Sequence, residues 1–122
     1  MKSLLVQNLS LSGSVPIILG ICDNFSSRFR GLMFYKTIPQ NGGLFFINST
    51  EDRVNSAIHM FFMKFDLTII WVDSTNRVVD KIKARKWQTL AAPRKGAKFI
   101  LETHIDRFDE YHLGDILEFC YE

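Results

Sequence analysis

Two nearly unbroken apolar runs, Ala57 to Met63 and Leu67 to Val72, constrain the fold of this chain more than any other feature. Strands that are covered on both faces have such runs, whereas strands with one wet face alternate apolar and polar residues. We therefore predict two interior strands here. His59 would then lie in an apolar setting, and Phe61 and Met63 would share its face of the strand.

Shorter strands are predicted wherever β-branched and apolar segments are bounded by turn residues. They cover residues 2–11, 15–22, 44–47, 77–82, 98–103 and 116–121. Turns through Ser12-Gly13-Ser14 and Asp73-Ser74-Thr75-Asn76 would connect two pairs of them as hairpins. The long segment from 84 to 96 is expected to be a basic loop.

A short amphipathic helix is predicted after Asp23 or Asn24, because Phe25, Phe29 and Leu32 recur at helical spacing behind these capping residues. A second short helix or turn is expected within 106–112. The fold class is therefore mainly β (α+β): a compact antiparallel β-barrel or sandwich of seven to eight short strands with one or two short helices.

The size and composition favour one domain over residues 1–122. The chain has 122 residues, 47% of them hydrophobic, and eleven phenylalanines can fill a sheet-based core. Cys22 and Cys120 lie in apolar stretches without zinc spacing, which predicts two buried free thiols; the alternative is a disulfide between the first and last strands. No apolar run is long enough to span a membrane, and no signal-peptide core is present, so we expect a cytoplasmic location.

Positive charge is concentrated in one segment. Residues 81–98 contain seven basic side chains and no acidic one. This predicts either an anion-binding face or an ordinary solvated surface beside the acidic C-terminal region. The candidate anion-binding residues are Lys83, Arg85, Lys86, Trp87, Arg94 and Lys95. Trp87 could stack on a nucleic-acid base in that case.

The familiar catalytic and cofactor motifs are absent from the sequence. It has no Gly-x-Ser-x-Gly elbow and neither a phosphate-binding nor a dinucleotide-binding glycine pattern. His59, His104 and His112 match no standard zinc spacing. We therefore expect no cofactor and no metal site, and the sequence gives no positive indication of an enzyme.

Five short blocks, taken in order, resemble a known family. They are Arg30-Gly31-Leu32-Met33, Gly43-Leu44-Phe45, Ile58-His59-Met60-Phe61-Phe62-Met63, Leu101-Glu102 and Gly114-Asp115. Their order over residues 15–121 is similar to that of domain-of-unknown-function family 192, a group of uncharacterised small bacterial and archaeal proteins. The resemblance implies a mostly β fold with a barrel-like core and no agreed activity.

The chain departs from the family pattern at two points. Thr68 stands where the resemblance leads us to expect an aspartate, and His104 and Ile105 replace a small Ala-Gly pair. A family site that used that aspartate would be altered here.

Polar residues inside apolar surroundings suggest a ligand pocket. The ligand-binding candidates are Arg30, His59, Phe61, Met63, Glu102 and Asp115. Each of the polar ones also has a structural explanation. A buried histidine can be satisfied by a backbone carbonyl, Arg30 can pair with Glu102 or Asp115, and Gly114-Asp115 fits a turn.

Three functions follow from these residues. The first is a small-ligand-binding or accessory module with a pocket at one end of the barrel, which makes a small molecule the expected partner. The second is nucleic-acid or anionic-surface binding through residues 81–98. The third is a hydrolase or isomerase with His59 as base and Glu102 or Asp115 as its orienting acid.

Overall fold

The computed structural model describes residues 2–24, 31–33, 35–60, 62–88 and 90–121, which form seven strands and one short 3-10 helix. The elements are β1 (Ser3–Asn8), β2 (Ile17–Cys22), β3 (Gly43–Asp52), β4 (Leu67–Val72), β5 (Val78–Ala84), β6 (Ala97–His104), η1 (Ile105–Glu110) and β7 (Leu117–Tyr121). The prediction of a mainly β fold with a minor helical part is confirmed.

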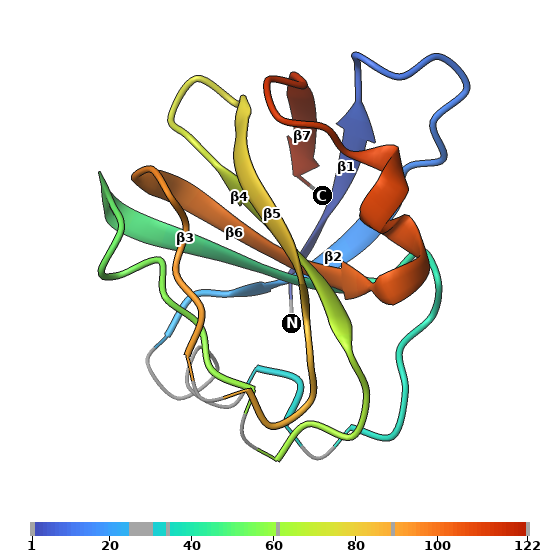
Figure 1. The fold of residues 1–122 in the computed structure, drawn as a ribbon. Helices are drawn as coiled ribbons and strands as arrows, with labels where there is room; N and C mark the ends of the chain where they lie inside the picture. Colours follow the sequence, from blue (N-terminus) through green and yellow to red (C-terminus); the bar gives the residue numbers. More distant parts are fainter. Residues whose placement is uncertain (1, 25–30, 34, 61, 89, 122) are drawn as a thin grey trace.

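The seven strands form one curled sheet in the order β5-β4-β6-β3-β2-β1-β7 (Figure 1). Five of its six pairings are antiparallel, while β2 and β3 run parallel. The two edge strands approach each other at one end, where Val78 N–H donates to the carbonyl of Asp115 at 2.9 Å and Leu117 N–H to that of Asn76 at 2.9 Å. The sheet is thus a half-barrel that closes at this end.

Strand β4 is buried along its whole length, as its apolar sequence predicts. Its alternate side chains enter two different cores. Leu67, Ile69 and Trp71 belong to a core that loop segments cover. Ile70 and Val72 belong to a second core, to which β1, β2, β7 and Tyr111 after η1 contribute. The central strands therefore have protein on both faces.

The strand predicted over Ala57 to Met63 is wrong: the described residues of this segment form a loop whose only ladder contact is an isolated bridge between Ile58 and Ala91. Ile58, Met60 and Met63 are buried all the same. They cover one face of the sheet as loop side chains, so burial here comes from packing and not from strand pairing. His59 is accordingly half-buried and is not enclosed within a strand.

Several smaller expectations have clear outcomes. Strand β3 continues to Asp52, five residues beyond its predicted end. The helix predicted after Asp23 falls mostly outside the described residues, and its last part, 31–33, is a turn. Cys22 is buried, as expected, but Cys120 is exposed, and the two are not joined in a disulfide bond. Within the described residues, no helix is long and apolar enough to cross a membrane.

Candidate functional site

A cavity of about 70 Å³ lies on the loop-covered face of the sheet. Its floor comes from β3 and β6, and its walls come from residues 31–33 and the loop before β4. The described lining residues are Gly31, Leu32, Met33, Phe46, Ala57, Ile58, His59, Met60, Met63, Ile100 and Glu102. Nearly all of them are apolar, so Glu102 and His59 supply the polar chemistry of this cavity.

Glu102 is a carboxylic acid on the face of β6 that also carries Ile100 and is turned toward the loop-covered core. The register sets it opposite Leu44 of β3 and Ile69 of β4, and its side chain is only slightly exposed. Among the described residues, none donates a hydrogen bond to its carboxyl group or forms an ion pair with it. Burial disfavours the charged form and raises the pKa of Glu102 to about 7.

Gly43 allows β3 to run close beside Glu102. Its φ of +147° is one that other residues rarely adopt, and a Cβ atom at this position would overlap the carbonyl oxygen of Glu102. Nearby, the Thr103 hydroxyl donates to the carbonyl of Gly42 at 2.7 Å. These contacts fix the backbone from which the Glu102 side chain enters the cavity.

His59 and Met63 reach the same cavity from a loop that is anchored just upstream of His59. Ile58 exchanges two backbone hydrogen bonds with Ala91, at 2.8 and 2.9 Å. Upstream, Ser56 is completely buried, and its carbonyl accepts a 2.7 Å hydrogen bond from the indole of Trp71. The predicted pocket residues His59, Met63 and Glu102 are thus brought together.

Ser56 is the centre of a buried polar cluster that secures this loop. Its hydroxyl oxygen accepts from the side-chain amide of Asn48 at 2.7 Å and lies 2.6 Å from the Asp52 carbonyl, to which it donates. Asn48 also donates to the carbonyl of Ala97 at 3.1 Å. The cluster joins the loop to both β3 and β6.

The other predicted pocket residues lie elsewhere or outside the description. Asp115 belongs to the turn before β7, where its carboxylate accepts hydrogen bonds from the Asn8 side chain at 2.8 Å and the His112 backbone at 2.9 Å. It does not line the cavity, and its turn explanation fits these contacts. Arg30 and Phe61 lie outside the described residues.

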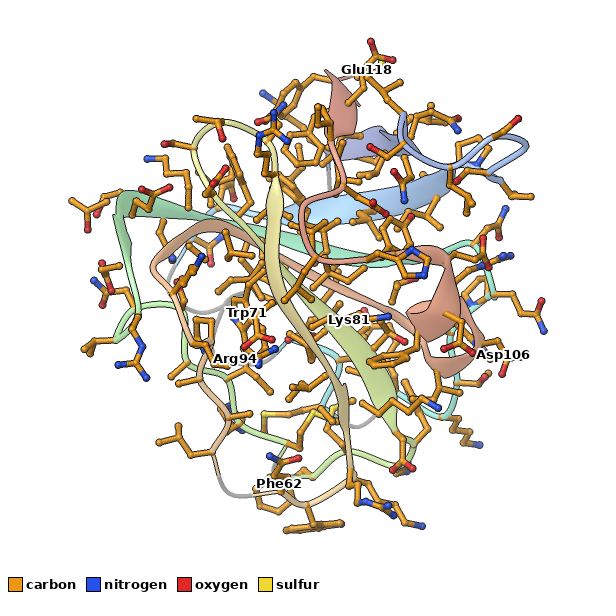
Figure 2. The ribbon with its side chains drawn as sticks, turned by 45° about the horizontal axis from the view of Figure 1, so that its top comes forward. Phe62, Trp71, Lys81, Arg94, Asp106 and Glu118 are labelled. Atoms are coloured by element: carbon orange, nitrogen blue, oxygen red, sulfur yellow. The ribbon has the colours of Figure 1, made fainter. Side chains whose placement is uncertain are left out.

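The basic side chains of residues 81–98 do not all lie together. Arg94 is bound to Asp80 at 3.0 Å, and Lys81 donates to the Phe108 carbonyl at 2.8 Å beside the Phe108 ring, over which Lys83 also lies. In Figure 2, Lys81 lies on the side of β5 that is turned toward η1, and Arg94 lies on the other side of this strand. The candidate cations are therefore spread over several parts of the molecule.

A second, open hollow of about 350 Å³ collects some of these cations. Arg77, Arg94 and Lys95 line it together with Asp73. Burial acts to raise the pKa of Asp80 beneath it, but hydrogen bonds from Arg94 and Lys81 outweigh this and lower the pKa. Arg94 thus serves an internal ion pair.

Sequence reasoning missed part of the cavity wall. In the sequence, Phe46 and Ile100 do not differ from ordinary core residues. The pairing of β3 with β6 places them beside Glu102. The described residues contain no group of three or more His, Cys, Asp or Glu side chains that could hold a metal ion.

The comparisons with known proteins bear on this fold and cavity together. The family model DUF192, described as "Uncharacterized ACR", matches residues 8–119. The chain belongs to this family. The cavity residues from Gly31 to Glu102 all lie within the matched part of this DUF192 domain.

Curated relatives of the DUF192 domain are archaeal UPF0127 proteins. One from Thermococcus kodakarensis is 43% identical over 99 residues, which are 80% of this chain and 61% of the relative. One from Pyrococcus horikoshii is 40% identical over 96 residues, 79% of this chain and 76% of the relative. The chain thus spans less than two thirds of the length of the Thermococcus protein.

Two solved structures share the fold. A candidate transcription regulator from Sinorhizobium meliloti superposes with a TM-score of 0.82 at 16% identity, covering 97% of this chain and 92% of its own. A protein of unknown function from Novosphingobium aromaticivorans superposes with a TM-score of 0.76 at 20% identity. The match covers 95% of this chain and 83% of that protein. At these identities the likeness concerns the fold alone.

Proposed function

We propose that this DUF192 domain binds a small ligand in the cavity between β3, β6 and the loop that carries His59. The observation that carries the proposal is Glu102, a mostly buried acidic residue that lines an otherwise largely apolar cavity. Apolar surroundings solvate a carboxyl group poorly, and this costs free energy. A ligand that hydrogen-bonds to Glu102 would recover that cost.

The lining residues suggest the chemistry of the ligand. Met33, Met60 and Met63 present flexible apolar side chains, which suit an aliphatic body. The volume of about 70 Å³ holds about five water-sized groups. With a pKa near 7, Glu102 is easily ionised by a neighbouring cation. A short aliphatic amine, or an amine-bearing end of a larger molecule, fits these features.

Methyl NMR tests the proposal directly. With methionine methyl groups labelled, n-butylamine at millimolar concentration is expected to shift the Met60 and Met63 signals, and n-butanol is expected to bind at least about tenfold more weakly because it cannot form an ion pair. Glu102→Gln should remove the preference for the amine. Glu118→Gln, which changes an exposed carboxylate, is the matched control.

Two results would contradict the proposal. One is the absence of any saturable methyl shift with the amine or the alcohol. The other is an equal loss of amine binding in the Glu102 and Glu118 variants, since this would show that general surface charge attracts the amine.

The alternatives derived from the sequence differ in their support. The dispersed basic residues do not favour binding of nucleic acid through residues 81–98, because Arg94 and Lys81 have internal partners. A hydrolase or isomerase that uses His59 and Glu102 stays a prediction; the presence of both residues in one cavity supports it, whereas Asp115 lies outside that cavity.

We also propose a cytoplasmic location. The support is that Cys120 is an exposed free thiol. A reducing compartment keeps an exposed thiol of this kind in its reduced form.

A further inference from the structure

The loops at one end of the half-barrel expose several large apolar side chains. Phe62 is 46% exposed, Trp87 54% and Leu90 65%. We call Phe62 and Trp87 the aromatic patch; Leu90 follows three residues after Trp87. Figure 2 shows Phe62 projecting from the end of the molecule that lies opposite Glu118. The rings of Phe62 and Trp87 are in edge-to-face contact, with centroids 5.0 Å apart.

The backbone holds the aromatic patch in place. Trp87 N–H donates to the Met60 carbonyl at 2.8 Å, and Met60 N–H donates to the Gln88 carbonyl at 2.9 Å. The two loops therefore form a short ribbon. Phe62 and Trp87 have φ values of +60° and +66°, which bulky residues rarely adopt and which cost about 1 kcal/mol each. The fold thus maintains two strained residues that display aromatic rings to solvent.

Three basic residues lie close to the aromatic patch along the chain, and we call them the basic rim. Lys64, Arg85 and Lys86 are exposed in the same two loops. They are close in space because β4 starts and β5 ends side by side, with Leu67 opposite Ala84. Asp66 is the acidic residue of these described loop segments, and its carboxylate accepts from the Lys86 backbone at 2.8 Å. Three cations against one anion leave an excess of positive charge.

We propose that this end of the molecule docks onto an anionic lipid bilayer, with the aromatic patch entering the headgroup region and the basic rim contacting lipid phosphates. Trp and Phe favour the membrane interface, and nearby Lys and Arg add attraction to anionic lipids. An aliphatic Leu90 suits acyl chains, whereas it offers no stacking surface to a nucleobase. The dispersal of the remaining basic residues likewise leaves no track for a nucleic-acid backbone.

Tryptophan fluorescence offers a clean test, because the two tryptophans differ in burial. Trp71 is fully buried, so a blue shift on adding vesicles reports Trp87. The wild-type chain is expected to bind vesicles of phosphatidylglycerol and phosphatidylcholine in a 1:3 ratio, with a blue shift that high salt reduces. Vesicles of phosphatidylcholine alone should bind at least about fivefold more weakly.

Matched variants separate the proposal from a general effect of charge or apolar surface. In vesicle sedimentation, Trp87→Ser should weaken binding about tenfold, whereas Tyr121→Ser, at an exposed aromatic residue of β7, should not. Lys64→Glu with Lys86→Glu should abolish binding, whereas Lys2→Glu with Lys95→Glu should retain it. Circular dichroism confirms that each variant is folded.

Three outcomes would overturn the proposal. The first is no binding of the wild-type chain to the anionic vesicles. The second is an equal effect of the Trp87 and Tyr121 substitutions. The third is Trp87-dependent binding of single-stranded oligouridylate by a chain that ignores the vesicles, which would assign the aromatic patch to RNA. None of these results depends on the cavity beside Glu102.

Discussion

Glu102 occupies a position where most strands would carry an apolar residue. Its neighbours Leu44 and Ile69 give the carboxylate nothing to bind, and burial raises its pKa to about 7 from an ordinary value of 4.5. The folded protein therefore holds the Glu102 proton over a pH range in which the unfolded chain has released it. Stability is highest below the unfolded pKa and falls as the pH rises through 7.

Replacement by glutamine should remove this pH dependence. In urea denaturation, the free energy of unfolding of Glu102→Gln relative to wild type is expected to increase by about 2 to 3 kcal/mol between pH 5 and pH 8. The reason is that the amide remains neutral where the carboxyl group must ionise. Glu118→Gln, at an exposed site, should show no comparable trend.

A constant difference between Glu102→Gln and wild type across this pH range would show that the carboxyl group titrates normally. The prediction would then fail, and with it the description of Glu102 as a shielded acid.

At the residue scale, the sequence pointed to individual polar residues of the cavity, but it did not show which segments pack against them. Glu102 stands out between Leu101 and Thr103, and His59 between Ile58 and Met60. Both line the cavity. Asp115 follows an equally conspicuous glycine but serves a turn, because a Gly-Asp pair fits a turn as readily as a pocket. A residue's type does not reveal which distant segment packs against it.

Among the elements, β4 and the loop before it show where hydrophobic patterns succeed and fail. The apolar run of Leu67 to Val72 predicts β4 with correct ends, because an interior strand needs apolar side chains on both faces. The run from 57 to 63 is equally apolar, yet it forms a loop that covers a core. A short apolar run indicates burial, and the hydrogen-bonding partner decides whether a buried segment is a strand.

Asp80 is the anchor for the loop that follows β5. It is 3% exposed, and it accepts hydrogen bonds from the Arg94 backbone at 2.9 Å, the Arg94 guanidinium at 3.0 Å and the Lys81 backbone at 2.9 Å. Asp80→Ala should lower the free energy of unfolding by about 2 kcal/mol, since it leaves these donors without their acceptor.

Chemical denaturation at neutral pH measures this effect. Asp73→Ala is a useful comparison, because that carboxylate also accepts backbone hydrogen bonds, from Thr75 and Arg77, but in an exposed turn. The comparison variant should lose less stability. A larger loss at Asp73 than at Asp80 would argue against an anchoring role for Asp80.

For the whole molecule, the mainly β class follows from the sequence but the strand order does not. The parallel pairing of β2 with β3 depends on contacts between segments separated by a long connection. Hairpins at 12–14 and 73–76 were predictable because turn residues act locally. Pairings such as β3 with β6 bring together residues about fifty positions apart, which no local pattern specifies.

The pairing of β1 with β7 has a consequence for how the chain can be connected. Leu4 lies opposite Tyr121, so the first and last strands are antiparallel neighbours, as if a hairpin between them had been cut. A linker of about four residues between them would restore that hairpin. A circular permutant that starts at Gly13 and ends at Ser12 is expected to fold, because the new break falls in an exposed turn.

Far-ultraviolet circular dichroism and a cooperative thermal transition would verify the rearranged chain, and a permutant broken between Ile69 and Ile70 inside β4 should fail both tests. Each strand would then keep its position in the half-barrel, although β1 would follow β7 in the sequence. The position of each strand beside its neighbours, and not the order of the strands along the chain, would then determine this fold.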